Sequence, residues 1–259
     1  MSKTFKAFRA LSLVSSPSAT FASGGRVTPN QKFLVLFGAP GVGKGTYAGL
    51  LAKDLQFNKI STGDEIRKII KGGEVGRMDP ALVAEVKKIV NEGRLVSDDI
   101  VLNILAEKLK EPASQKGVIL DGFPRTLSQL AKYDEQFPVD AVVNVELRGD
   151  ILLEKLLGRR TCIGCGNSYN VCNINKDEYQ MEPLLPKKEG TCDKCGGKLV
   201  IRDDDTEAVI TSRMREYDEK TLPLLNEYKK KGVLMNFEVK KGVKDYPKLL
   251  EQIKPKLGL

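Results

Sequence analysis

The sequence predicts an α/β fold built on a parallel sheet, and three observations lead to that prediction. A chain of 259 residues with 41% hydrophobic and 29% charged residues suits one large globular domain, or one domain with an insert. Short apolar runs rich in β-branched residues recur along the chain, and longer helical stretches separate them. Strands that alternate with helices form parallel sheets with right-handed crossovers.

The expected elements follow in order from residue 32. A short apolar run at 32–37 is followed by a glycine-rich turn and a helical stretch through Asp54. Later runs with strand character lie at 117–120, 141–145 and 233–237, and residues 98–109 have helical periodicity. The longest apolar run, 33–37, is far short of the ~20 residues that a membrane-spanning helix needs. We therefore expect no transmembrane segment and no membrane partner.

Two residue types are absent, and one absence narrows the chemistry. The chain contains no His, which excludes imidazole acid–base catalysis, Ser–His and Cys–His nucleophile pairs, and His metal ligands. It contains no Trp either, so an aromatic binding surface would use Tyr or Phe. Five Cys remain, and any metal site has to be built from thiolates and carboxylates.

The N-terminal stretch 1–31 has the composition of an organelle transit peptide. It contains four basic residues and no acidic one, and it accounts for half of the formal net charge of +8. It is rich in Ser and Thr, and on a helical wheel its bases lie opposite Phe5, Phe8 and Leu11. We expect a mitochondrial location, with the matrix favoured; a plastid, or a cytoplasmic protein with a basic tail, is the alternative. The remaining charge is modest and does not by itself indicate nucleic acid.

Residues 38–46, with the sequence GAPGVGKGT, predict a phosphate-binding loop. They follow the first predicted strand and open a helix, where backbone N–H groups and the positive end of the helix dipole face an anion. The general GxxxxGK[ST] pattern is not fully met, because Gly45 separates Lys44 from the hydroxyl of Thr46. The residues expected to bind ATP phosphates are Gly41, Val42, Gly43, Lys44, Gly45 and Thr46.

This loop resembles that of the adenylate kinases and related nucleoside monophosphate kinases. Further motifs of that family occur in order: ISTGDEIR at 60–67, GRLVSD at 93–98, LDGFPRTLSQ at 120–129, GRR at 158–160, and RDDD at 202–205 with Arg213. The resemblance implies a P-loop α/β fold with a five-stranded parallel sheet flanked by helices. It also implies a kinase domain over 32–259, with a helical monophosphate-binding region at 61–96 and a zinc-stapled lid at 159–202.

The resemblance also implies the roles of the site residues. Phosphoryl transfer needs two nucleotides held in line and positive charge around the transferring group. The residues expected to be catalytic are Lys44, Arg125, Arg159, Arg202 and Arg213. The donor nucleotide would also contact Arg159, Ser168 and Tyr169. Magnesium would be held through water by Asp121, or more weakly by Asp64. AMP would be bound by Thr62, Arg67, Arg94, Leu95, Val96, Gly122, Phe123, Pro124, Arg125, Gln129, Arg202 and Arg213.

Two positions depart from the family pattern. Lys155 stands where many relatives carry an Arg that contacts the donor, so the charge is kept and the planar fork is lost. Tyr47 stands where Gln is common, and the sequence indicates no role for it.

A cysteine-rich stretch interrupts the α/β pattern between residues 162 and 202. Its two CxxC pairs, Cys162 with Cys165 and Cys192 with Cys195, predict a tetrahedral thiolate site for Zn²⁺. Disulfide pairing is the alternative, and a reducing compartment disfavours it. Because two such pairs leave no open coordination position, the zinc should be structural. The fifth cysteine, Cys172, has no partner in this pattern.

The function expected from these motifs is reversible transfer of the terminal phosphoryl of Mg-ATP to AMP, giving two ADP. A GTP:AMP phosphotransferase is the alternative on the same scaffold. A zinc-ribbon ATPase that depends on nucleic acid is the alternative from a different class, and acidic residues between the CxxC pairs disfavour it. A GTPase is rejected, because the only approach to its guanine motif, NKDE at 175–178, lies inside the cysteine-rich stretch. We expect a monomer that binds ATP or GTP and AMP, and no nucleic acid.

Overall fold

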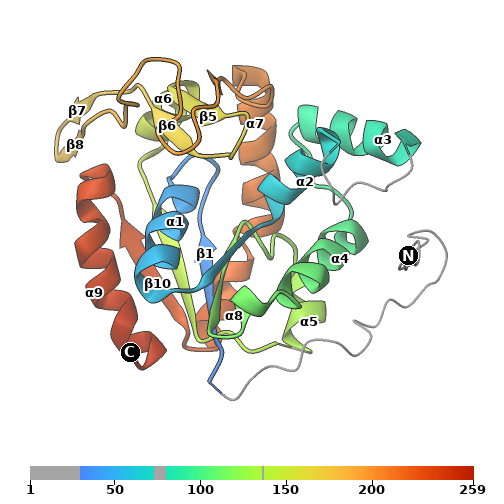
Figure 1. Ribbon diagram of the computed structural model, residues 1–259. Coiled ribbons are helices and arrows are strands. Elements are labelled where there is room, and N and C mark those ends of the chain that lie inside the picture. Colours follow the sequence, from blue (N-terminus) through green and yellow to red (C-terminus); the bar gives the residue numbers. More distant parts are fainter. Residues whose placement is uncertain (1–29, 73–79, 136) are drawn as a thin grey trace, which may run out of the picture.

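The computed structural model describes residues 30–72, 80–135 and 137–259, and its centre is a five-stranded parallel sheet (Figure 1). The strand order is β10-β4-β1-β3-β2, and every neighbouring pair is parallel. The predicted fold class is therefore confirmed. The strands are β1 (Lys32–Phe37), β2 (Asn58–Ser61), β3 (Gly117–Asp121), β4 (Ala141–Glu146) and β10 (Leu234–Glu238).

Strand β1 lies in the middle of the sheet and shows why the fold is stable. Its side chains alternate between two hydrophobic clusters, with Leu34 and Leu36 on one face and Phe33 and Val35 on the other. All of them are at most 1% exposed. A parallel strand covered on both faces needs such a continuous apolar run, and for that reason the first strand could be predicted from the sequence.

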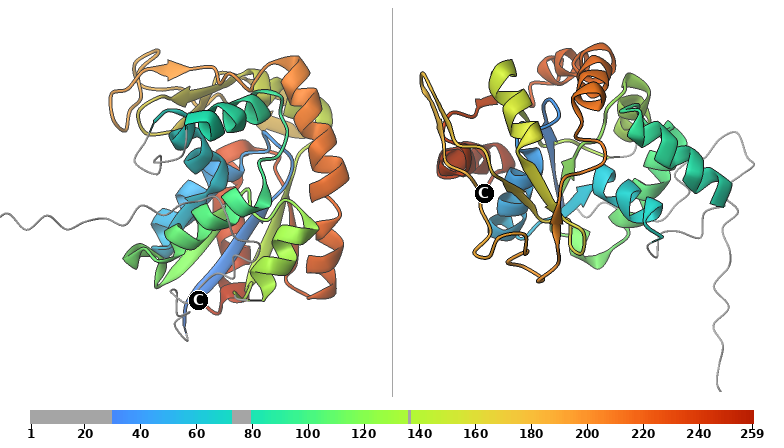
Figure 2. Two further views of the ribbon diagram at one scale, coloured as in Figure 1. Left: turned by 90° about the vertical axis from the view of Figure 1, so that its right-hand side faces the viewer. Right: turned by 90° about the horizontal axis from the view of Figure 1, so that it is seen from above.

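Helices cover both faces of the sheet, as the buried clusters require (Figures 1 and 2). The face of Leu36 packs against α1 (Lys44–Leu55), α6 (Gly149–Leu157) and α9 (Tyr246–Leu257). The opposite face packs against α2 (Thr62–Ile70), α3 (Pro80–Asn91), α4 (Asp98–Leu109), α5 (Leu127–Asp134) and α8 (Leu224–Lys230). The remaining helical segments are α7 (Glu207–Glu216), a π-helical turn (Tyr217–Thr221) and two 3₁₀ turns (Pro112–Ser114 and Gly242–Asp245).

The carboxyl ends of all five strands lie at one edge of the sheet. The register pairs Leu36 with Asp121, Ser61 with Asp121, and Glu146 with Glu238. Ligands of open α/β sheets bind in the crevice outside this edge. The cysteine-rich stretch lies above it, with α2 and α3 beside it (Figures 1 and 2).

The cysteine-rich stretch folds into two separate pieces. One piece, which we call the cysteine module, is a small antiparallel sheet with the order β6-β5-β9, formed by β5 (Arg159–Cys162), β6 (Ser168–Asn170) and β9 (Leu199–Val200). Its own small core contains Tyr169 and Leu199 beside Cys162 and Cys192. The other piece is a hairpin of β7 (Ile174–Lys176) and β8 (Tyr179–Met181).

The hairpin packs on the main body of the molecule, which the sequence did not lead us to expect. Its Ile174, Tyr179 and Met181 are at most 5% exposed and belong to the same cluster as the face of α1 and α9. The backbone N–H of Gln180 donates to the carbonyl of Lys240 at 2.9 Å, directly after β10. The predicted lid range 159–202 therefore contains one piece with its own core and one piece that shares the core of the sheet.

The observed strands extend slightly beyond the apolar runs that predicted them. Strand β3 includes Asp121 and β4 includes Glu146, because backbone pairing continues through polar residues at the sheet edge. Helix α4 has the predicted bounds, 98–109. The transit peptide predicted at 1–31 lies almost entirely outside the described residues. Within the described residues, no helix combines the length and apolarity that crossing a membrane requires.

The packing of Gly117 against Phe57 provides a test of the core. A Cβ at Gly117 would lie 2.6 Å from the Phe57 ring, which is itself buried. Gly117→Ala should therefore lower the free energy of unfolding by about 1–3 kcal/mol, as overpacking does. Gly149→Ala is the matched control, because a Cβ there meets no atom within 4 Å; in a helix it should be neutral or stabilising by up to about 1 kcal/mol. Urea unfolding measures both, and equal stabilities of the two variants would contradict this packing.

Candidate active site

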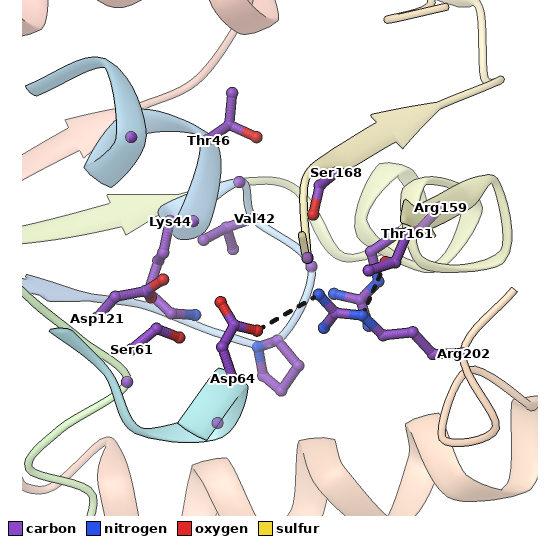
Figure 3. A pocket seen from close by; sticks show the side chains of 18 of the residues that line it. Val42, Lys44, Thr46, Ser61, Asp64, Asp121, Arg159, Thr161, Ser168 and Arg202 are labelled. Carbon is purple, nitrogen blue, oxygen red and sulfur yellow. Dashed lines mark hydrogen bonds and ion pairs between the residues drawn. The ribbon is translucent and has the colours of Figure 1, made fainter. Parts of the chain in front are cut away.

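A cavity of about 1040 Å³ lies at the carboxyl edge of the sheet, between the main body and the cysteine-rich stretch (Figure 3). Its walls come from the predicted phosphate loop, the ends of β2 and β3, helices α2, α6 and α7, and the cysteine module. Every residue predicted to contact ATP, AMP or magnesium lines this cavity. The fold thus brings together side chains from segments more than 150 residues apart.

The phosphate loop lies between β1 and α1 and curls around its own lysine. Gly38 has a φ of 134°, and a Cβ there would lie 2.3 Å from the carbonyl oxygen of Val145, so only glycine fits this turn. Gly43, with a φ of 104°, precedes α1 and accepts from the N–H of Thr46 at 2.9 Å. The Lys44 ammonium donates to the carbonyls of Gly38 and Ala39 at 2.7 and 2.8 Å. The first residues of α1, Lys44 to Thr46, line the cavity, and the amino end of a helix is a favourable site for an anion.

Burial lowers the pKa of Lys44 from 10.5 to about 7. Asp121 opposes this shift, whereas Arg125 and Arg213 add to it. An anion in the loop would reverse the shift, because a nearby negative charge favours the ammonium form. The lysine is therefore close to half-protonated at neutral pH until an anion arrives.

Two arginines on the lid side are held by one buried carboxylate. The guanidinium of Arg159 donates to both oxygens of Asp205, with 2.8 Å between its Nε and Oδ2. Arg213 donates to Asp205 Oδ1 at 3.2 Å and forms an ion pair with Asp204 at 3.1 Å. The Asp205 side chain is fully buried, and these two guanidinium groups balance its charge. Asp204 and Asp205 were predicted only as part of the RDDD motif, without a role.

A second carboxylate joins the lid side of the cavity to helix α2. Asp64 accepts a hydrogen bond from Arg67 at 2.6 Å and lies 3.9 Å from the guanidinium of Arg202 (Figure 3). Arg202 also donates to Thr161 Oγ1 at 2.9 Å. Burial raises the pKa of Asp64, but the Arg67 guanidinium and the other cations nearby together lower it by a larger amount, so that the pKa falls to about 2. Asp64 therefore acts as a counter-ion for two arginines, whereas Asp121 forms an ion pair with one ammonium, that of Lys59, at 3.7 Å.

Positive charge remains in excess around the cavity. Burial, with Arg67 and Arg159 nearby, lowers the pKa of Arg202 to about 9. Burial also lowers the pKa of Arg213 to about 10, although Asp204 opposes this. Both shifts have the direction expected for guanidinium groups that are buried beside like charges with too few anions to balance them. The empty cavity is therefore electrostatically prepared for polyanions such as nucleotide phosphates.

The far end of the cavity is built around the LDGFPRTLSQ motif. Gln129 is 2% exposed; its Oε1 accepts from the Arg125 backbone N–H at 2.8 Å, and its Nε2 donates to Asp98 at 2.7 Å. Thr62 donates to the Gly122 carbonyl at 3.0 Å. Arg125 is also bound to Gly122, with its Nε donating to that carbonyl at 2.7 Å. These contacts hold the Arg125 guanidinium at the cavity wall. The polar side chains of Gln129 and Thr62 lie beside it and could form hydrogen bonds with a base.

Two predicted contacts occupy unexpected positions. The Arg94 side chain lines the cavity, but it is 53% exposed and forms an ion pair with Glu92. The Tyr169 hydroxyl points into the cysteine module, where it donates to Cys192 Sγ at 3.6 Å and accepts from the Asp193 N–H at 2.7 Å. Their roles in nucleotide binding remain predictions.

The four cysteines of the two CxxC pairs form one cluster. Their sulfur atoms all lie within 4.8 Å of one another, and Cys162–Cys195 and Cys165–Cys192 are separated by 3.4 and 3.6 Å. A tetrahedron of thiolates with Zn–S bonds of about 2.3 Å has edges of about 3.8 Å, so the cluster fits Zn²⁺. All five cysteines of the chain are free, and no disulfide competes with the metal.

The two cysteine turns have the same backbone geometry. The N–H of Gly166 donates to the Cys162 carbonyl at 3.0 Å, and the N–H of Gly196 donates to the Cys192 carbonyl at 2.9 Å. Both glycines have a left-handed φ, of 74° and 71°. The repeated turn places each pair of thiols on one side of the backbone, as a closed structural metal site requires.

Two side chains at the site, Tyr47 and Lys59, were given no role from the sequence, and for a third, Lys155, only the partner was not predicted. Tyr47 packs edge-on against Phe237, and its hydroxyl donates to the Gly242 carbonyl at 2.6 Å. The Lys155 ammonium lies 3.6 Å from Met181 Sδ of the hairpin. Lys59 forms an ion pair with Asp121 at 3.7 Å. The partners of these side chains come from other elements, so sequence spacing contains no signal for them.

A phosphate-binding loop and a cluster of arginines in one cavity indicate a particular chemistry, the binding and transfer of phosphate groups. They can hold two phosphate groups in line and stabilise the charge of a transferring phosphoryl. The fold and the site together therefore define a P-loop phosphotransferase.

Comparison with known proteins identifies the family within that class. The family model described as adenylate kinase matches residues 36–233. Adenylate kinase 1, chloroplastic, of Arabidopsis thaliana is 41% identical over 253 residues, which cover 93% of this chain and 85% of the relative. An adenylate kinase of Archaeoglobus fulgidus is 37% identical, covering 86% of this chain and 98% of the relative. A GTP:AMP phosphotransferase of Plasmodium falciparum is 38% identical, covering 82% and 92%.

The chain belongs to the adenylate kinase family and is a nucleoside monophosphate kinase or a close relative. The expectation drawn from the ordered motifs is confirmed at this level.

The pKa of Lys44 gives a test of the phosphate loop. With a pKa of about 7, most of the free enzyme carries neutral Lys44 at pH 8. Binding of a magnesium–nucleotide complex should then take up close to one proton, and affinity should fall as the pH rises above 7. Calorimetric titration at pH 8 in two buffers of different ionisation enthalpy gives the number of protons taken up on binding, from the difference between the two binding enthalpies. Lys44→Arg is the control, because arginine stays protonated and should show no uptake. Equal proton counts for the two proteins would contradict the assignment.

Proposed function

We propose that this enzyme reversibly transfers the terminal phosphoryl of Mg-ATP to AMP, giving two ADP. The observation that carries the proposal is a single cavity in which the Lys44 loop and five arginines face one another. The same cavity is lined by Gln129 and by Gly242, next to which we propose the two nucleosides would bind.

The donor would occupy the side of the phosphate loop. Gly41–Thr46 would hold its phosphates through backbone N–H groups and the Lys44 ammonium. Its base would lie near Gly242, Val243 and Met181, which line that end of the cavity. Tyr47 supports this wall, because its hydroxyl binds the Gly242 carbonyl from below. Lys155 replaces the usual arginine there and offers an ammonium beside the thioether of Met181.

The acceptor would occupy the opposite side. Arg67 and Arg125 would hold the phosphate of AMP, and Gln129 would face the adenine edge with Thr62 beside it. The Gln129 amide is already fixed by Arg125 and Asp98, so its orientation is set before a base arrives. Leu95, Val96, Phe123 and Pro124 line the same side and supply apolar surface for the base.

Transfer would rely on position and charge. Arg159 and Arg213, aligned by Asp205, and Arg202, aligned by Thr161, would converge on the phosphoryl between the two nucleotides. Charge in a water-excluded site stabilises the transition state more strongly than in water. When bound with the nucleotide, Mg²⁺ supplies further positive charge on the phosphate oxygens, and the Asp121 carboxylate is placed to hold its water shell.

The alternative donor, GTP, is supported by one observation. The name of the Plasmodium falciparum relative describes transfer from GTP to AMP, at an identity similar to that of the adenylate kinases. Gly242 and Val243 line the cavity, and their backbone groups could contact either purine. We propose ATP as the main donor, a monomeric enzyme, and no nucleic-acid partner.

We propose an organellar location for this enzyme. The basic, Ser-rich stretch 1–31 supports a transit peptide, although almost all of it lies outside the described residues. The chloroplastic relatives of Arabidopsis thaliana and Oryza sativa support the plastid more than the mitochondrial matrix that we expected from the leader.

A coupled assay of diphosphate formation tests the reaction. ATP and GTP are each combined with AMP, GMP, CMP and UMP, and we expect strong turnover only with AMP and a faster rate with ATP. Lys44→Ala and Arg125→Ala should each lower kcat at least about 100-fold, as removal of one charge-stabilising group does. Arg215→Ala, an exposed arginine on α7, is the control and should retain normal turnover.

Three results would overturn this function. Normal turnover in Lys44→Ala or Arg125→Ala, with circular dichroism showing an intact fold, would remove the assigned site. Turnover with another monophosphate would change the acceptor. Loss of ATP that requires nucleic acid and no monophosphate would favour the zinc-ribbon ATPase.

We also propose that the cysteine cluster binds one structural Zn²⁺ per chain. Cys165→Ser should lose zinc and lower the unfolding temperature, because a three-thiolate site binds zinc more weakly. Cys172→Ser is the matched control: its Sγ donates only to the Glu154 carbonyl, which a hydroxyl can also reach. Metal analysis and thermal unfolding measure both variants. Full zinc content in Cys165→Ser, or loss of zinc in Cys172→Ser, would refute the assignment.

A further inference from the structure

Lys59 lies at the phosphate site, and none of the roles described so far uses it. It lies on β2, paired with Ile119 of β3, and its side chain is 26% exposed. Its ammonium donates to the Gly45 carbonyl at 3.1 Å and forms an ion pair with Asp121 Oδ2 at 3.7 Å. A second ammonium therefore lies beside the loop that already contains Lys44.

Gly45 brings these groups together at one point. A Cβ at Gly45 would lie 3.3 Å from Asp121 Oδ2 and 3.7 Å from Lys59 Nζ. The missing side chain lets the carboxylate and the ammonium meet against the first turn of α1, whose N–H groups face the anion site. Both charged groups line the cavity, so phosphates bound in the loop would reach the same place.

The pairing has a consequence for the metal. Lys59 is the side chain that forms an ion pair with Asp121 in the described part of the chain. A hydrated Mg²⁺ that approaches Asp121 has to share the carboxylate with this ammonium. When a nucleotide arrives without a metal, the ammonium is free to turn from Asp121 to a phosphate oxygen, where charge-assisted hydrogen bonds are strongest.

We propose that Lys59 is a phosphate-binding cation that partly substitutes for Mg²⁺, by binding the donor's phosphates when the metal is absent and neutralising Asp121 when the site is empty. The inference rests on the proposed placement of the donor in the phosphate loop. It makes this enzyme less selective for the magnesium complex over the free nucleotide than it would be without Lys59.

Calorimetric binding of ATP, and of GTP in a parallel series, tests this inference without any acceptor. Each nucleotide is titrated into the full chain in excess Mg²⁺ and again in buffer freed of Mg²⁺ but without a chelator, so that the proposed Zn²⁺ is not removed. Lys59→Gln should raise the Kd of the metal-free nucleotide about tenfold, the loss expected for one charge-assisted contact, and leave that of the magnesium complex within about twofold. Lys59→Arg should retain the ratio of the wild-type protein. Lys53→Gln, which removes an exposed charge from α1, is the control for net charge.

The substitution Asp121→Asn provides a second, independent test of the proposal. It frees Lys59, so the metal-free nucleotide should bind at least as tightly as in the wild type while the magnesium complex binds more weakly. The two substitutions therefore shift the ratio of the two Kd values in opposite directions. Equal weakening of both complexes by Lys59→Gln, or no change in either, would overturn the role of Lys59. Because these titrations need no transfer, a wild type that binds donor but makes no diphosphate would overturn the proposed function and leave this inference standing.

Discussion

The site depends on keeping several like charges buried side by side. Charged groups in a low-dielectric cavity are stable only when counter-ions or ligands balance them. Asp64, Asp204 and Asp205 supply part of that balance, and each of them holds its arginines in a fixed direction. The balance is incomplete, as the lowered pKa values of Lys44 and Arg202 indicate. Polyanionic nucleotides complete it, so binding should stabilise the fold as well as fill the site.

The parallel sheet is what brings these charges to one place. All five strands end at the same edge, and the segments that follow β1, β2 and β3 carry Lys44, Asp64 and Arg125. Helices on both faces bury the strands and fix the position of that edge. The cysteine module adds Arg159 and Arg202 from the opposite side. Stability and function are thus divided, with apolar residues in the strands and charged residues just beyond them.

Local signals made the central parts of the structure predictable. The run at 32–37 is apolar because β1 is covered on both faces, and the glycines at 38, 41 and 43 follow because the loop needs left-handed backbone there. Asp205, Tyr47 and Lys59 were not predicted, since each acts through a partner on a distant element: Arg159, Gly242 and Asp121. The hairpin 174–181 was missed for a related reason. Its alternating Ile174, Tyr179 and Met181 predict a buried face but contain no information on which part of the molecule buries it.

The docking of this hairpin changes how the cysteine module is connected to the rest of the chain. The polypeptide enters the module at Arg159, leaves it after Asn170 for the hairpin, returns after Met181, and leaves again after Val200. A module attached by a single entry and exit could swing and twist freely about that one point. Here the chain crosses between module and body four times, which would restrict twisting of the module relative to the body. Four connections instead of two would also keep Arg159 and Arg202 in a fixed position relative to the phosphate loop.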